Sequence, residues 1–454
     1  MKLNKKQLNR TLEVSIKEGN YYSFMMGFYQ YYITAFVEFL KATPLQISYL
    51  ATLPVFIASI IQLFTVRVNN LIGNRKNSLF ILGTVQTICI LIATVIAGFY
   101  PTLQFFLIVN VFFSIFAEVT NNIWTSLMGD VVPENIRGRF FGKRARINGI
   151  YSTISIILAG FVLHEISIYD ESLGFAVIFF IGSIFRMFSC FLYFKHYDPK
   201  TSKETIGSIN MFSFIYANKH TPFVKYIFYS SIYTFVNSWG IPVYTILFLR
   251  YFNFSYLQYS IIIFLLPLTS YFCNYVWGYW SDYAGNRKVM LSGYWILAIL
   301  PFNWFFCLQF FEGYVAFILI IINQIIAGMA WAGINLGSFN YILDTVDKKD
   351  KMVQLTYLKA INGFFIFVGA LTGAFFAEID SIFPNITSMP LINTPYIIPI
   401  ILCGIGRVFM LMFFNRFIEE TKSKIRDISV FKLIISIPIQ GFFLDTGFAL
   451  KRKK

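Results

Sequence analysis

Long apolar stretches dominate the chain, and polar residues gather in the short intervals between them. An apolar helix of about 20 residues spans the hydrocarbon core of a bilayer, which is about 30 Å thick. Membrane strands would instead alternate apolar and polar positions, and the run 105–116 does not alternate. The pattern therefore predicts an all-α polytopic membrane protein. Its twelve expected spans are 20–40, 46–66, 78–98, 103–128, 147–167, 173–194, 223–249, 256–280, 289–310, 314–343, 355–378 and 395–415.

Short matches recur along the chain at a nearly constant separation. The tetrapeptide Gly-Asn-Arg-Lys occurs at 73–76 and again at 285–288, which is 212 residues later. Matches that share one separation indicate an internal duplication. The hydropathy pattern agrees, because six of the expected spans fall in each half. Further matches, at separations of 212 to 221, pair 45–48 with 257–260, Pro54 with Pro267, Asn121 with Asn335, Asp130 with Asp344, 147–149 with 361–363, and Arg186 with Arg407.

The charge distribution indicates the orientation in the membrane. Only 13% of the 454 residues are charged, against about 25% in a soluble domain, and the formal net charge is +15. Nearly all Lys and Arg residues fall at the two ends of the chain and in every second interval between spans. This is the positive-inside pattern, which predicts that both termini are cytoplasmic. The basic excess is therefore interpreted as a topology signal and not as a nucleic-acid-binding surface.

The polar intervals divide the chain into four expected parts. These are an N-terminal six-helix bundle at 1–195, a cytoplasmic linker at 196–222, a C-terminal six-helix bundle at 223–416 and a cytoplasmic tail at 417–454. Within the tail, 428–444 is apolar with a polar stripe, which favours an interfacial amphipathic helix over a thirteenth span. The five cysteines lie in apolar spans without a CxxC motif, and the three histidines form no cluster. We therefore expect no metal site and no cofactor.

Two polar intervals carry the residues of a family motif. The interval after the eighth span has the pattern G-x-x-x-D-x-x-G-x-R-K over 278–288, and it resembles the loop signature of the major facilitator superfamily, with Tyr283 where that signature has Arg. The interval 129–144 is similar to the D-x-x-P-x-x-x-R-G-x-x-x-G pattern of many bacterial facilitator carriers. Two parallel six-span halves with cytoplasmic ends also resemble this superfamily. The resemblance covers nearly the whole chain, to about residue 416.

Polar residues inside the expected spans indicate where a solute binds. On span four, Asn110, Ser114, Glu118 and Thr125 recur at steps of four or seven residues, so they share one helix face. The resemblance implies that spans one, four, seven and ten line a central cavity, and aromatic faces with a few polar groups suit a small organic solute. The candidate cavity residues are Gln30, Thr34, Glu118, Asn121, Thr125, Asn237, Trp239, Tyr244, Asn323, Trp331 and Asn335.

Glu118 is the candidate proton-coupling residue. A charge near the middle of a bilayer costs about 2.5–3.5 kcal/mol on insertion scales, so it faces protein or water. A carboxyl group there could exchange protons and couple solute movement to proton flow. Two alternatives stay open, a permanent pair with a basic residue of the same half and direct binding of the solute.

The cytoplasmic turns supply candidate gate residues. An aspartate at a helix end can pair with nearby Arg and Lys residues, and contacts made in only one conformation bias the equilibrium between states. We expect Asp282 to pair with Arg287 and Lys288, and Asp130 to pair with Arg137, Arg139 and Arg144. The alternative is that the basic residues only set the topology. Arg186 and Arg407 occupy equivalent places in spans six and twelve, and each is expected to be a structural clamp with an acceptor in its own half. The candidate gate residues are Arg75, Lys76, Asp130, Arg137, Arg139, Arg144, Asp282, Arg287 and Lys288.

These observations predict a secondary transporter that moves a small organic solute by alternating access of two six-helix bundles. Its expected partners are the solute and the lipid bilayer, without nucleic acid, and proton coupling is a hypothesis. A monomer in the bacterial cytoplasmic membrane is expected. The rival interpretations are a non-transporting membrane sensor with the same fold and a polytopic membrane enzyme. The sequence has no H-E-x-x-H motif, no His-rich site and no P-loop, so no enzyme activity is expected.

Overall fold

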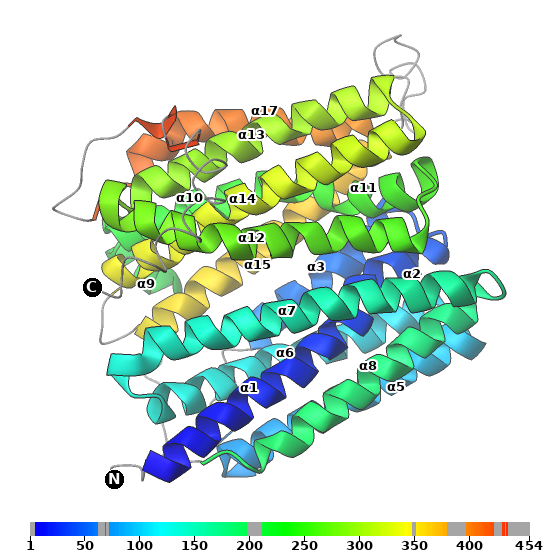
Figure 1. Cartoon of the computed structure of the whole chain (residues 1–454). Helices are drawn as coiled ribbons and strands as arrows, with labels where there is room; N and C mark the ends of the chain where they lie inside the picture. The colour runs from blue at the N-terminus through cyan, green and yellow to red at the C-terminus, as the bar shows by residue number, and fades with distance from the viewer. Residues whose placement is uncertain are drawn as a thin grey trace, which may run out of the picture. The chain divides into compact units, whose positions relative to one another are not determined.

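The computed structural model describes residues 5–61, 69, 72–197, 211–346, 351–378, 396–421, 429–431 and 433–434, without the side chains of 5–6, 134–139, 142, 275 and 351–352. This part of the chain is built from helices, and Figure 1 shows how they follow one another. The chain divides into two compact units. The first comprises Met1–Ser208 and Thr245–Ile261, and the second comprises Ile209–Tyr244 and Ile262–Lys454.

The first unit is a helical bundle in which α1 packs against α7 and α8, and α5 packs against α6 and α8. Leu79, Val119, Ile123 and Cys190 belong to its buried apolar core. Its helices are α1 (Lys5–Phe28), η1 (Gln30–Tyr32), α2 (Ile33–Phe39), α3 (Pro44–Ile61), α5 (Arg75–Phe99), α6 (Leu103–Val131), α7 (Glu134–Ser167) and α8 (Glu171–Tyr193), with η4 (Leu247–Tyr251) from later in the sequence.

The second unit is also a helical bundle, in which α13 packs against α14 and α17, and α10 packs against α15 and α17. Aromatic residues form much of its core, where the ring centroids of Tyr233 and Tyr294 lie 4.4 Å apart. The short helix α9 falls within the interval expected to be a linker. The helices that lie wholly or mostly in this unit are α9 (Met211–Ala217), α10 (Pro222–Asn237), η3 (Ser238–Gly240), α11 (Ile241–Ile246), α12 (Tyr256–Ala284), α13 (Asn286–Phe310), α14 (Gly313–Thr345), α15 (Lys351–Ala377) and α17 (Ile397–Phe417).

The helices agree with the expectation of a polytopic membrane protein. Within the described residues, eleven helices are long and apolar enough to cross a membrane, and they match eleven of the twelve expected spans. The first expected span, 20–40, differs because it is not one helix. α1 begins as early as Lys5, ends at Phe28 and is followed by the 3-10 turn η1 before α2. The apolar tail segment 428–444 lies almost entirely outside the described residues.

The side chains on the outer faces of the helices fit a lipid environment. Ile81, Ile88, Ile92 and Val95 on α5 are 45 to 50% exposed and recur at helical spacing. A soluble monomer rarely shows such a continuous apolar face. Exposed apolar residues on one face and buried residues on the other are expected of a helix at the edge of a membrane bundle.

The repeated Gly-Asn-Arg-Lys tetrapeptide forms the same turn twice. Gly73 has φ +83° and Gly285 has φ +94°, a region that glycine occupies without steric cost. Each glycine stands just before a helix, at α5 and α13. The connection at 129–144 is shorter than the sequence indicated, since α6 continues to Val131 and α7 starts at Glu134. Pro133 between them cannot continue α6, because it lacks the backbone N–H.

Candidate functional site

The first cluster of polar residues lies on α1, in a segment that the sequence pattern placed outside the membrane spans. Thr11, Ser15 and Glu18 are 1%, 0% and 2% exposed. Their spacing of four and three residues puts them on one face of the continuous helix. Glu18 was not predicted as a site residue. The same spacing was visible in the sequence, but the expected start of the span at residue 20 excluded it.

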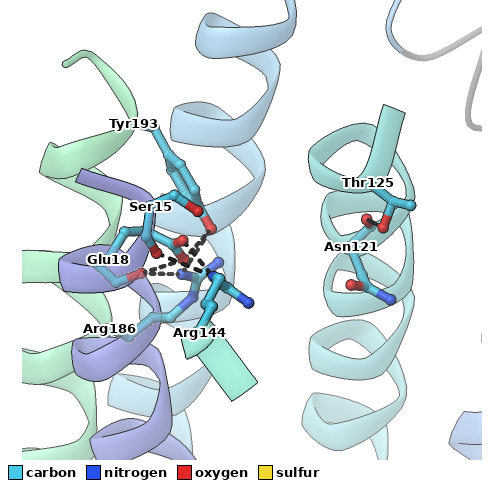
Figure 2. A network of polar contacts seen from close by, with 8 residues as sticks. Ser15, Glu18, Asn121, Thr125, Arg144, Arg186 and Tyr193 are labelled. Carbon is cyan, nitrogen blue, oxygen red and sulfur yellow. Dashed lines mark hydrogen bonds and ion pairs between the residues drawn. The ribbon is translucent and has the colours of Figure 1, made fainter. Parts of the chain in front are cut away.

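Glu18 is held by groups from two other helices, as Figure 2 shows. Arg144 Nη2 on α7 lies 3.3 Å from Glu18 Oε2, and Arg144 Nε donates to the Ser15 carbonyl oxygen at 3.2 Å. The hydroxyls of Ser189 and Tyr193 on α8 donate to Glu18 Oε1 at 3.3 and 3.2 Å. A buried carboxylate is stable only when its oxygens are paired in this way. The network joins three helices of the first unit around one charge.

Arg186, predicted as a clamp, belongs to the same network. It is fully buried, and its Nε donates to Gln86 Oε1 on α5 at 3.0 Å. Its Nη1 donates to Ser189 Oγ at 3.0 Å and to the Tyr193 hydroxyl at 3.5 Å. Both hydroxyls also contact Glu18, so two guanidinium groups share the Glu18 carboxylate, Arg144 directly and Arg186 through hydroxyls. These contacts are consistent with the predicted structural clamp. The clamp role of Arg186 stays a prediction.

His196 lies beyond the end of α8 and beside this network. It is 2% exposed, and neither of its ring nitrogens has a partner among the residues described. Burial lowers the pKa of His196 below its usual value of 6.5, and Glu18 opposes this shift while Arg144 and Lys76 add to it. The imidazole is therefore neutral at physiological pH, because burial away from water disfavours its charged form.

The polar face of α6 divides into an interior part and an exposed part. Asn110 is buried and accepts a hydrogen bond from the Tyr29 hydroxyl at 3.0 Å. Asn121 and Thr125 are exposed, and Thr125 Oγ1 donates to the Asn121 carbonyl oxygen at 2.7 Å (Figure 2). Glu118 lies between these parts, half-buried and within electrostatic range of Tyr22 on α1. Its coupling role stays a prediction.

The remaining cavity candidates of the first unit lie along η1 and α2. Gln30 is exposed, and the Thr34 and Tyr259 hydroxyls are 3.2 Å apart. Farther along, Glu38 is 7% exposed and its Oε1 lies 2.7 Å from Arg250 Nε. The sequence analysis did not single out this ion pair, because its partners are 212 residues apart. Thus Thr34 and Glu38 each contact the segment Thr245–Ile261 of the same unit.

In the second unit, the candidates of span seven lie where its helix is interrupted. α10 ends at Asn237, the 3-10 turn η3 contains Trp239, and α11 follows. Pro242 explains the interruption, because it cannot donate to the carbonyl oxygen four residues earlier. Arg407 on α17 reaches this point, and its Nη2 donates to Asn237 Oδ1 at 2.8 Å. Its Nη1 donates to the Leu297 carbonyl oxygen at 2.7 Å, which supplies the expected acceptors within the unit.

The candidates on α14 have different surroundings. Asn323 is 2% exposed, and its amide oxygen and nitrogen have no partner in the described part of the chain. Trp331 is half-buried and Asn335 is exposed. Tyr244, at the end of span seven's α11, packs its ring 5.5 Å from that of Trp304. The cavity assignment of these residues stays a prediction.

Two gate candidates of the first unit, Arg75 and Asp130, form a short ion pair. Arg75 is 4% exposed, and its Nη1 lies 2.7 Å from Asp130 Oδ2 and 3.2 Å from Ser126 Oγ. Asp130 was expected to pair with Arg137, Arg139 and Arg144. Arg144 instead pairs with Glu18, as described above, and the side chains of Arg137 and Arg139 lie outside the described residues. Lys76 is half-buried, and its backbone N–H donates to the Asn74 side chain that caps α5.

The corresponding turn of the second unit has other partners. Arg287 Nη2 donates to Asn415 Oδ1 at 2.6 Å, and its Nε donates to the Ile418 carbonyl oxygen at 2.9 Å. Asp344 accepts hydrogen bonds from Asn286 Nδ2 at 3.2 Å and from a threonine after α17. Asp282 is exposed and Lys288 is half-buried. Asp344 was visible in the sequence as the repeat partner of Asp130, and it was missed as a candidate gate residue.

Metal chemistry finds little support in these clusters. Among the residues described, no group of three His, Cys, Asp or Glu side chains could hold a metal ion. The five cysteines are all buried free thiols.

Comparison with solved structures shows the fold. A nucleoside transporter, NupG, superposes with a TM-score of 0.62 at 16% identity, covering 89% of this chain and 98% of that one. A D-xylose–proton symporter gives a TM-score of 0.68 at 14% identity, with 92% and 100% covered. A bacterial homologue of the human lysosomal transporter Spinster gives 0.66 at 12% identity, with 91% and 97% covered. No curated protein matches the sequence.

The family comparison extends over both halves. The model of the Major Facilitator Superfamily matches residues 20–266 and 227–444, which is most of the chain. The match agrees with the two helical units and with the eleven spanning helices. It also identifies the chain as a secondary transporter and not an enzyme. The chain belongs to the Major Facilitator Superfamily.

Proposed function

We propose that this transporter moves a small organic solute and that Glu118 couples the movement to protons. The observation that carries the proposal is a half-buried carboxyl in the 29-residue apolar helix α6, within electrostatic range of Tyr22 on α1. A carboxyl group there is costly unless it faces protein or water, and such residues mark ion and proton pathways. The exposed Asn121 and Thr125 on the same helix would keep the site hydrated.

The choice of solute follows from the side chains that surround the candidate residues. Aromatic rings with a few polar groups suit a polar organic molecule of modest size. Two of the structural neighbours are named as a nucleoside transporter and as a D-xylose–proton symporter. Their fold is shared, and their solutes are a reasonable first set to test here. The sugar symporter also makes a proton the first coupling ion to test.

The orientation completes the proposal. We infer twelve spans, cytoplasmic termini and a monomer in the bacterial cytoplasmic membrane, with bundles at 1–195 and 223–416 joined by the linker 196–222. The support is the concentration of Lys and Arg in alternate intervals. Labelling of single cysteines introduced at each end, from either side of sealed vesicles, measures this orientation. Reaction of either terminus from the outer face would contradict it.

Flux through proteoliposomes tests the coupling. Wild type should accumulate solute when a proton gradient is imposed, and Glu118→Gln should lose accumulation while it keeps exchange of labelled for unlabelled solute. Glu165→Gln, an exposed carboxyl at the end of α7, is the matched control and should retain both. Full proton-driven accumulation by Glu118→Gln would refute the coupling role. Loss of both activities would favour direct solute binding by Glu118, and binding without flux in wild type would favour a membrane sensor.

A further inference from the structure

The two buried arginines that the repeat aligns have different surroundings. Arg186 in the first unit is linked through two hydroxyls to the Glu18 carboxylate. Arg407 in the second unit is 7% exposed and donates to the Asn237 amide oxygen and the Leu297 carbonyl oxygen. Both acceptors are neutral. The side chains of Cys403 and Tyr244 also contact its guanidinium. No ion pair joins Arg407 to a carboxylate within the described part of the chain.

The repeat shows where the missing charges would be. The interruptions of the first and seventh spans, η1 and η3, begin 208 residues apart, so Tyr226 is the repeat partner of Glu18. Leu358 stands 214 residues after Arg144, the separation at which 147–149 match 361–363. The second unit therefore has Arg407 without a counterpart of the Glu18–Arg144 ion pair. A buried guanidinium without a counter-charge is costly, so a negative charge from outside the chain would stabilise it.

Donor groups around Arg407 are left without acceptors. The Nε of Arg407 and the hydroxyl of Tyr233 are buried and have no hydrogen-bond partner among the residues described. Tyr233 and Tyr244 both lie within electrostatic range of the guanidinium. The Asn237 amide oxygen accepts from Arg407, so its NH₂ group is the part of this side chain that can donate to a ligand. Buried polar groups are almost always satisfied, so two unsatisfied donors at one place favour a bound acceptor.

We propose that Arg407, Asn237 and Tyr233 form an anion-binding site in the second unit. The ligand is an oxyanion, either the carboxylate or phosphate of the transported solute or a free phosphate ion. An oxyanion accepts hydrogen bonds from guanidinium, phenol and amide donors together, and bonds to an ionised acceptor are the stronger ones. If the oxyanion belongs to the transported solute, the proposal rests on the proposed function. Asn237, the half-buried last residue of α10, is also a candidate residue of the solute cavity.

The tyrosines of α10 provide a matched pair of variants. Tyr229 and Tyr233 lie one turn apart, are 0% and 3% exposed, and both have a buried hydroxyl without a partner among the residues described. Only Tyr233 is among the groups that interact with the charge of Arg407. Tyr233→Phe and Tyr229→Phe remove the same atom at little cost to folding. Arg407→Gln removes the charge itself, and the tyrosine pair keeps the test valid if that variant does not fold.

The experiment measures binding to the purified protein by thermal shift in a chloride-free buffer. The probes are inorganic phosphate and matched neutral and anionic solutes, namely glucose with gluconate and uridine with uridine monophosphate. Anionic probes should raise the unfolding temperature more than their neutral partners. Tyr233→Phe should weaken that binding about tenfold or more, the loss of one hydrogen bond to a charged group. Tyr229→Phe should bind as wild type does.

The outcomes separate the possible sources and the two proposals. A response to gluconate or the nucleotide that Tyr233→Phe weakens assigns the site to the solute, and a response to phosphate alone assigns it to a free ion. Equal binding of neutral and anionic probes, or equal effects of the two tyrosine variants, would overturn the anion site. Flux of a neutral solute in proteoliposomes would then still support transport. Absence of all flux together with anion binding sensitive to Tyr233→Phe would refute transport and keep the site.

Discussion

Neutralising Glu18 is the perturbation whose effect can be worked out most directly. The change Glu18→Gln keeps the size of the side chain and an oxygen that can accept the Ser189 and Tyr193 hydroxyls. It removes the one carboxylate that Arg144 and Arg186 share. Arg144 then loses its ion pair, and Arg186 loses the negative charge that it reaches through the Ser189 and Tyr193 hydroxyls. We expect the free energy of unfolding to fall.

The size of the loss follows from burial. Removal of one partner from a buried ion pair costs about 3–5 kcal/mol. Here the Arg144 side chain is 18% exposed, so water screens part of its charge, and the hydroxyl bonds survive in the variant. Glu18→Gln should therefore cost about 2–3 kcal/mol, at or just below the lower end of that range. Glu13→Gln makes the same change at an exposed position of the same helix and should stay within about 0.5 kcal/mol of wild type.

A second variant distinguishes charge from packing. Arg144→Gln leaves Glu18 with Arg186, so the cluster retains one charge of each sign. It loses the hydrogen bond to Ser15 and the stacking of the guanidinium over Trp124, whose ring centroid is 4.1 Å away. Such a cation–π contact contributes about 0.5–2 kcal/mol. Arg144→Gln should thus cost less than Glu18→Gln.

The assay is reversible unfolding in mixed detergent micelles, followed by tryptophan fluorescence. All four proteins are measured at one pH and one micelle composition, because bound detergent changes apparent stability. If Glu18→Gln unfolds with the same free energy as Glu13→Gln, charge compensation by Glu18 is wrong. If Arg144→Gln is the more damaging change, packing over Trp124 dominates and the shared carboxylate is secondary.

Two further variants test the helix packing and the buried imidazole. A Cβ at Gly373 would meet the Trp239 carbonyl oxygen and lie 2.6 Å from Trp239 Cα. Gly373→Ala should therefore lower the free energy of unfolding by about 1–3 kcal/mol. Gly129 has open space around it, so Gly129→Ala should lower it by nothing in the same unfolding assay. Because the folded pKa of His196 is below 6.5, the unfolded chain binds the proton first as pH falls, and wild type should lose stability between about pH 7 and pH 5. His196→Gln should remove that part of the loss in melting curves taken across this range, and an unchanged pH profile would contradict the buried neutral imidazole.

The fold was predictable because hydropathy and duplication report it independently. Eleven of the twelve expected spans are confirmed as helices of spanning length. The predicted limits of the first span were wrong. A helix with polar residues on its buried face has a low mean hydropathy, so a hydropathy window does not detect its full length. Thr11, Ser15 and Glu18 lie inside the bundle and not in water. Hydropathy averages over a helix, so it cannot tell a buried polar face from an exposed one.

The partners of the candidate residues were less predictable. Arg186 and Arg407 were found from the repeat, but Gln86 and Leu297 bind them because helices distant in sequence meet in space. Motif spacing suggested that Asp130 pairs with basic residues just after it. The structure gives it Arg75, which is 55 residues earlier. A charged residue inside an apolar span is recognisable in the sequence, because such a position is energetically costly. Which groups pair with it depends on how the helices pack.

The wide turn η4 constrains the length of the chain near Arg250. Its backbone bonds skip one residue more than an α-helix allows, as in the 2.9 Å bond from Phe252 N–H to the Leu247 carbonyl oxygen. One additional residue in a turn rotates the residues after it by about 100° around the helix axis. The contact of Arg250 with Glu38 therefore depends on how many residues precede it. Deletion of a single residue from this turn would separate the two charges while leaving both in the sequence, so here the register, more than the residue types, is under constraint.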